Sequence, residues 1–234
     1  MASSAPPPTV PRRRGPSPAR LVTVYAVLCL AVGLGWLAGS AAMPKTDVPL
    51  GPRAAPPPPP NHVRTDLEEL LWPPDLNADR EWQFIVIHHT ATHQGTLESI
   101  TRGHRLRLHT EDAGYHFIIN NGQAEGTRDG QITPTPRWYE QRGGAHCLVD
   151  KHPEFNSGGI GIALVGHFNQ YRPSANQMAS LERLVILLRS RYEIPLDCIY
   201  GHGELKNTEC PGRLFPLDQF LLDLRRTYIQ ERIK

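Results

Sequence analysis

The sequence predicts one α/β domain, built on a single mixed central β-sheet flanked by helices and preceded by an N-terminal transmembrane or signal segment. Two observations lead to this fold class. The first third of the 234-residue chain is rich in Pro, Ala and Arg, so only the later part can bury a core. From residue 63 onward, short apolar runs alternate with helix-like segments, which is typical of a sheet covered by helices.

Three segments precede the predicted domain. Residues 1–20 hold many prolines and four arginines and are expected to be disordered. Residues 21–43 carry no charge, and because about 20 apolar residues can cross a bilayer, they form a transmembrane anchor or a cleaved signal peptide. Residues 44–62 include a run of five prolines and are expected to be an extended linker.

The long basic leader favours an uncleaved anchor over a signal peptide. Basic residues before a spanning segment favour a cytoplasmic N-terminus, so the domain is expected on the extracytoplasmic side of the membrane. The domain would instead be secreted if the segment is cleaved.

The domain itself is expected to span residues 63–234. Its first strand is expected over residues 84–88, a β-branched apolar run suited to burial. Residues 96–109 lack proline and strand-like alternation and are interpreted as a helix. A second strand over 115–120 ends at Asn-Asn-Gly, which is turn chemistry, and residues 123–127 could return beside it.

A loop rich in Gly, Pro and His is expected over residues 128–159, and long loops on a rigid scaffold often carry function. A third apolar strand follows at 160–166. Ser174 opens a helix, with Gln177 in the capping-box position and apolar residues at helical spacing. A short strand at 199–200 and a closing helix over 217–226 complete the domain.

Three residues offer the donor atoms that zinc prefers. His88 ends the first strand, and His202 and Cys210 bracket the loop after the last strand. Three protein ligands would leave one coordination position open for water, which is the arrangement of zinc hydrolases. His89 is expected to pack in the core or to support a ligand, because neighbouring side chains on a strand point to opposite faces and both histidines cannot face one metal without distortion.

Four segments in order resemble one family, the N-acetylmuramoyl-L-alanine amidases that include phage amidase-lysozymes and animal peptidoglycan recognition proteins. The resemblance covers roughly residues 82–216, through the segments IVIHHTAT, GYHFIIN, FNSGGIGIALVGHFN and GHGELKNTECPG. It implies a zinc-dependent enzyme that hydrolyses the amide bond between the lactyl group of N-acetylmuramic acid and L-alanine in peptidoglycan.

The resemblance also implies roles for individual residues. His88, His202 and Cys210 would bind Zn²⁺, Tyr115 would orient the attacking water and steady the oxyanion, and Thr208 would hydrogen-bond the scissile carbonyl. Some members carry a glutamate in the central strand where this chain has Ala163, so no carboxylate base is expected there.

Two further residues are assigned to substrate binding. His146 resembles a groove histidine of the phage relatives, although a plain role in its loop stays open, and Asn156 lies in the segment before the central strand.

Several alternatives follow from the same residues. A non-catalytic peptidoglycan-binding receptor would use the same fold, but such members typically lose the cysteine ligand that this chain keeps as Cys210. A Cys–His nucleophilic hydrolase could use Cys210 with His202. A closed structural zinc site is the weakest alternative. Cys147 and Cys198 could form a disulfide or stay as two buried thiols.

The net charge of +2, with basic residues scattered among acidic ones, argues against a nucleic-acid partner. Nothing in the sequence indicates an oligomeric state.

Overall fold

The computed structural model describes residues 65–76, 80–108, 110–147 and 152–233. The predicted tail, apolar segment and linker, residues 1–62, lie outside this part of the chain. Among the described residues, no helix has both the length and the apolar character needed to cross a membrane.

The described residues form one five-stranded mixed sheet, as predicted. Its strands are β1 (Phe84–His89), β2 (Phe117–Asn121), β3 (Asp129–Pro134), β4 (Gly159–Leu164) and β5 (Ile199–Gly201). The strand order is β3-β2-β4-β1-β5, with β3 antiparallel to β2 and the other neighbours parallel. The sheet thus places β1, which contains His88, beside β5, which directly precedes His202.

The helices lie before, between and after these strands. They are α2 (Asp66–Leu71), α3 (Leu97–Leu108), α4 (Pro136–Tyr139), α5 (Glu154–Ser157), α6 (Ala175–Tyr192), η2 (Leu196–Cys198), α7 (His202–Leu205) and α8 (Leu217–Ile233). The three predicted helices correspond to α3, α6 and α8. The closing helix α8 is longer than expected and reaches Ile233 rather than residue 226.

Two expectations about the middle of the domain are wrong. The strand that returns beside β2 is not residues 123–127, because Gly122 and Gly126 both take positive φ angles (70° and 75°) and the turn continues to Asp129. The predicted loop over 128–159 contains β3, α4 and α5. The segment therefore has more regular structure than its Gly and Pro content indicates.

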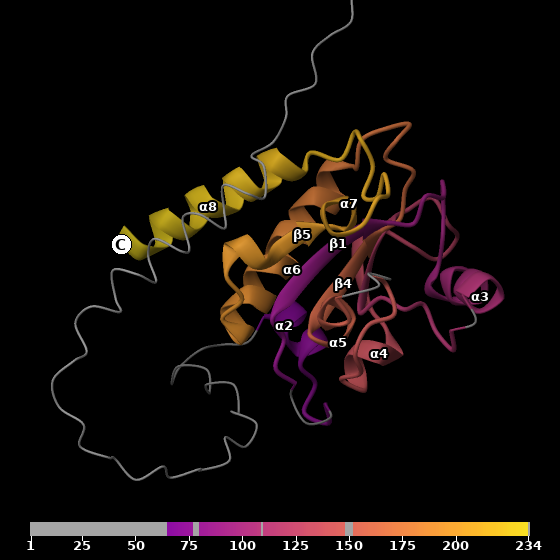
Figure 1. The fold of residues 1–234 in the computed structure, drawn as a ribbon, viewed down its shortest axis with the longest axis horizontal. Coiled ribbons are helices and arrows are strands. Elements are labelled where there is room, and N and C mark those ends of the chain that lie inside the picture. The colour runs from indigo at the N-terminus through magenta and orange to yellow at the C-terminus, as the bar shows by residue number, and fades with distance from the viewer. Residues whose placement is uncertain (1–64, 77–79, 109, 148–151, 234) are drawn as a thin grey trace, which may run out of the picture. The chain divides into compact units, whose positions relative to one another are not determined.

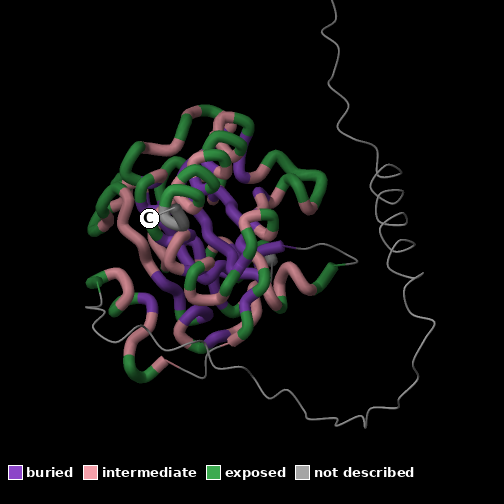
Figure 2. The backbone as a smooth tube through the Cα atoms, turned by 90° about the vertical axis from the view of Figure 1, so that its left-hand side faces the viewer, coloured by how far each residue is buried: buried purple, intermediate pink, exposed green. Residues whose placement is uncertain are grey.

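The two faces of the sheet differ. Alternate strand residues such as Ile87 and Ile162 join the main core, which also takes in α6 and α8. The residues between them, such as Ile118 and Ala163, form a smaller cluster with Ile100 of α3. Figure 1 shows α6 and α8 on one side of the strands and α3 on the other, and Figure 2 shows the buried segments gathered in the interior, with exposed segments around them.

Helix α6 anchors the larger core. Ser174 accepts a hydrogen bond from the backbone N–H of Gln177, and the Gln177 side chain reaches back to Ser174, which is the predicted capping box. Its apolar stripe is buried at Leu181, Leu184, Val185 and Leu188. Each such side chain contributes about 1.5–3 kcal/mol when fully buried, so this face holds the sheet rigidly behind the site.

Candidate functional site

His88 lies near the end of β1, between β4 and β5. It pairs in register with Ala163 of β4 and shares the face of the smaller cluster, on the α3 side of the sheet. Because Ala163 is its neighbour, β4 places no carboxylate beside His88. His89 follows on the opposite face, where its Nδ1 accepts a hydrogen bond from the backbone N–H of Phe168 at 3.2 Å.

His202 and Cys210 lie at the two ends of one tight loop. His202 is the first residue of α7, directly after β5, and the backbone N–H of Gly203 donates to the carbonyl of Cys210 at 2.6 Å. A Cβ atom at Gly203 would lie 2.8 Å from the carbonyl oxygens of both Thr208 and Cys210. Only glycine allows the loop to close this far, and closure carries Cys210 back toward β1.

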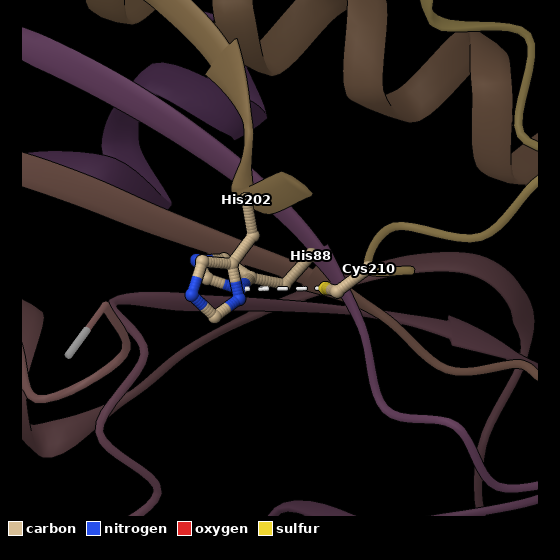
Figure 3. Close-up of side chains that lie close together, drawn as sticks. All are labelled: His88, His202 and Cys210. Carbon is tan, nitrogen blue, oxygen red and sulfur yellow. Dashed lines mark hydrogen bonds between the residues drawn. The ribbon is translucent and has the colours of Figure 1, made fainter. Parts of the chain in front are cut away.

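The three predicted ligands converge. One donor atom each from His88, His202 and Cys210 lies within 4.8 Å of the others. Figure 3 shows the three side chains, from β1, the end of β5 and the loop before α8, turned toward one another. This grouping is the main observation at this site. It brings together His88 and Cys210, which lie 122 residues apart in the sequence.

The donor set fits zinc. Cys210 Sγ lies 3.7 Å from His88 Nδ1, close to the ~3.6 Å expected between sulfur and nitrogen ligands of a tetrahedral zinc ion. His202 Nε2 is buried and has no hydrogen-bond partner. A buried polar atom without a partner is costly, and a metal ion near this ring would be one way to satisfy it.

The metal-free site is electrically neutral. Burial lowers the pKa of His88 well below its ordinary value, with His146 and His202 adding to the effect, and lowers the pKa of His202 to about 4. Burial raises the pKa of the Cys210 thiol to about 12. Both imidazoles therefore keep a free lone pair at neutral pH, which is the form that binds metal.

Tyr115 packs beside the ligands. It lies two residues before the start of β2, and its ring centroid lies 5.2 Å from that of His88. Its carbonyl accepts a 2.7 Å hydrogen bond from the Thr135 hydroxyl. Burial raises the pKa of the Tyr115 phenol, so the hydroxyl stays protonated and can donate a hydrogen bond near neutral pH.

A buried ion pair that the sequence did not reveal fixes the segment that carries Tyr115. Asp112 Oδ1 accepts from Arg137 Nη2 at 2.6 Å and from the backbone N–H of Gly114 at 2.9 Å. Arg142 Nη2 donates to Asp112 Oδ2 at 2.7 Å. Arg137 also donates to the carbonyl of Gly143, so the pair joins the Tyr115 segment to the loop before His146.

Replacing Asp112 with Ala is expected to lower the free energy of unfolding by about 3–5 kcal/mol, because it leaves Arg137 buried without its partner. Burial alone would raise the pKa of Asp112, but the hydrogen bonds from Arg137 and Gly114 outweigh it and lower the pKa. The stabilisation of the folded state by ionised Asp112 is therefore fully present above the unfolded carboxyl pKa of about 3.9. It is lost as the pH falls through the pKa of Asp112 in the folded state, which is lower.

Urea unfolding at neutral and acidic pH measures this difference. Glu140→Ala is the matched control, since its ion pair with Arg142 is exposed and should contribute less than about 1 kcal/mol. Equal effects of the two substitutions would show that the buried pair does not hold the segment.

The remaining predicted site residues lie around this centre. Thr208 is exposed on the Cys210 loop, and its hydroxyl accepts from the backbone N–H of Cys210 at 3.3 Å. His146 is buried and its Nδ1 lies 3.1 Å from His88 Nε2. Asn156 Oδ1 accepts from the backbone N–H groups of His146 and Cys147, at 3.1 and 2.9 Å. Asn156 thus holds the His146 loop in place, and its assignment to substrate binding stays a prediction.

In the part of the chain that the structure describes, the two cysteines outside the centre are free thiols. Cys147 is buried, and Cys198 is partly buried in η2. Of the two possibilities left open by the sequence, the structure has the separate thiols.

The chain resembles known proteins over the same region. The model of the N-acetylmuramoyl-L-alanine amidase family matches residues 78–213. A peptidoglycan-recognition protein of Drosophila simulans is 33% identical over 144 residues, which cover 56% of this chain and 69% of that protein. Peptidoglycan-recognition protein SC2 of Drosophila melanogaster is 32% identical over 142 residues, 55% of this chain and 67% of that protein.

Among the similar solved structures, one example resembles this chain in both sequence and fold. It is the N-acetylmuramoyl-L-alanine amidase LysC from Clostridium intestinale, which is 32% identical, with a TM-score of 0.52. The alignment covers 62% of this chain and 86% of that protein.

Proposed function

This chain belongs to the N-acetylmuramoyl-L-alanine amidase family, and from that premise we propose that it is a zinc-dependent hydrolase of peptidoglycan. The bond cut is the amide between the lactyl group of N-acetylmuramic acid and L-alanine. The convergence of His88, His202 and Cys210 is the observation that carries the proposal. A related amidase of known structure supports the same activity.

His88, His202 and Cys210 would hold the ion through two nitrogen atoms and one sulfur atom. Bound there, zinc supplies a Lewis acid for the scissile carbonyl and a water molecule acidic enough to attack near pH 7. Tyr115 donates its hydroxyl proton in a hydrogen bond to the oxygen that becomes negatively charged. A neutral donor fixed in position is well suited to this task, since it needs no reorganisation as charge develops.

Thr208 is a second donor in the proposal. Its side chain lies on the loop that ends at Cys210, and its hydroxyl accepts from the Cys210 backbone N–H, so its own proton stays available for a carbonyl oxygen near the ion. No buried carboxylate faces His88 from β4, because that position is Ala163. The attacking water would therefore rely on zinc for its acidity and on Tyr115 for its orientation, with no carboxylate base from β4.

The metal-free chemistry of Cys210 argues against a Cys–His nucleophile. A nucleophilic cysteine needs a lowered pKa, and burial raises the pKa of Cys210 to about 12. Cys210 Sγ lies 3.7 Å from His88 Nδ1, within a cluster of three side chains that could hold a metal ion.

The test is incubation of the zinc-loaded full chain with a soluble muramyl peptide, followed by labelling of new amino groups. A free L-alanine amino terminus and a muramic acid carboxylate are the expected products. Binding without turnover at full zinc occupancy would instead identify a receptor, as in the alternative considered from the sequence.

We also propose that residues 21–43 anchor the chain in a membrane and that the domain faces the extracytoplasmic side. The proposal rests on the uncharged apolar run and the basic leader alone. N-terminal sequencing of the protein from the membrane fraction is expected to give the first residues of the chain. A mature end near Met43 would show a cleaved signal and a secreted domain.

A further inference from the structure

The His146 ring occupies a place built for it. A Cβ atom at Gly144 or at Gly161 would overlap this ring, so both positions need glycine while His146 stays there. The backbone on either side of His146 is held by Asn156, whose Nδ2 also donates to the carbonyl of Cys147 at 2.7 Å. The residue is 7% exposed, which leaves little of it for contact with a substrate.

Both nitrogens of this ring have partners. His146 Nε2 lies 3.2 Å from the carbonyl oxygen of Gly159, the first residue of β4. His146 Nδ1 lies 3.1 Å from His88 Nε2. His88 in turn presents its other nitrogen, Nδ1, to Cys210 Sγ. A continuous chain of polar contacts therefore runs from the start of β4 to the metal ligands.

The Gly159 carbonyl, at one end of this series of contacts, sets the direction of each hydrogen bond in the series. A carbonyl oxygen can only accept, so the proton of the neutral His146 ring lies on Nε2. Its Nδ1 then carries a lone pair and can only accept. His88 must therefore donate from Nε2, which leaves the lone pair of His88 on Nδ1, the nitrogen that faces Cys210.

We propose that His146 is a positioning residue that holds His88 in the Nε2–H tautomer, with Nδ1 free to bind the metal. The expected effect of His146 on zinc binding rests on the proposed zinc function. The tautomer of His88 does not depend on the metal. Metal-binding histidines usually donate their second N–H to a carboxylate, carbonyl or water. Here the acceptor is a second histidine, whose own tautomer is set by a β-strand carbonyl.

The first experiment is imidazole ¹H–¹⁵N NMR on the zinc-free full chain. We expect His88 as the Nε2–H tautomer in the wild type and as a mixture in His146→Phe, which keeps a flat ring without an acceptor. A wild-type His88 protonated on Nδ1, or one present as a mixture, would overturn the inference. This measurement stands even if His146→Phe fails to fold.

The second experiment is zinc affinity by competition with a chelator. His146→Phe is expected to weaken zinc binding by about 10- to 100-fold, the usual effect of removing the partner of a ligand. His146→Asn, whose Oδ1 can replace Nδ1 as acceptor, is expected to bind more tightly than His146→Phe. The control is His116→Phe, because His116 is a buried histidine with both nitrogens bonded to Gly161 and Arg142 rather than to a ligand.

An unchanged affinity in His146→Phe, or an equal loss in His116→Phe, would overturn the inference. Failure of the wild type to bind zinc would instead contradict the proposed function, while the NMR result on the zinc-free chain would still decide the tautomer.

Discussion

Replacing Cys210 with Ala is expected to abolish detectable peptidoglycan hydrolysis and to weaken zinc binding by about 10²- to 10³-fold. Zinc binds small four-ligand protein sites with about 10–16 kcal/mol, so one ligand accounts for about 3 kcal/mol. Cys210 is the sulfur donor of the cluster, and the loop closed at Gly203 brings it to His88. Chelator competition and the rate of L-alanine-headed peptide release measure the two effects.

Cys198→Ala is the matched control for this variant. Cys198 is also a free, partly buried thiol, but it lies in η2 and is not among the clustered donor atoms. We expect its zinc affinity and activity to equal those of the wild type. Full activity in Cys210→Ala would refute the metal assignment, and equal inactivation by both substitutions would indicate a general effect of thiol loss.

Replacing Tyr115 with Phe is expected to lower kcat by about 10²- to 10³-fold while zinc affinity stays unchanged. The phenyl ring can still pack against His88 and His104, at centroid distances of 5.2 and 5.1 Å in the wild type. Only the hydroxyl is lost, and removing one donor to a developing oxyanion typically costs this much. Steady-state kinetics on a muramyl peptide, together with zinc titration, separate the two quantities.

Tyr139→Phe controls for the loss of a tyrosine hydroxyl elsewhere. The Tyr139 hydroxyl donates to the carbonyl of Leu70 at 3.4 Å, between α4 and α2. Its removal should leave kcat unchanged. A Tyr115→Phe variant that keeps wild-type kcat would exclude the hydroxyl from catalysis, whereas a parallel loss of zinc would show that Tyr115 acts by supporting the ligands.

The convergence of His88, His202 and Cys210 could be predicted in part because two of these residues adjoin strands with strong local signals. The β-branched run before His88 and the short strand before His202 are visible in the sequence, and parallel pairing in one sheet brings their ends together. Cys210 lies at the end of the loop that begins at His202, and this loop closes back toward His88. The family resemblance, over residues 82–216, agrees with the matched range 78–213.

The surroundings of the centre could not be predicted in the same way. The contact between His88 and His146 joins residues 58 positions apart, and the pair of Asp112 and Arg137 spans 25. Neither contact follows a periodicity or a spacing, since each depends on how loops pack over the sheet. The strand β3 was misplaced for a related reason, because glycines at positive φ extended the turn before it.

The most direct test of the account is mass spectrometry of purified peptidoglycan digested by the full chain before chelation, after chelation and after zinc is restored. The account predicts peptides with free L-alanine amino termini, lost on chelation and recovered with zinc. Cleavage that persists after chelation, or no cleavage at confirmed zinc occupancy, would contradict it.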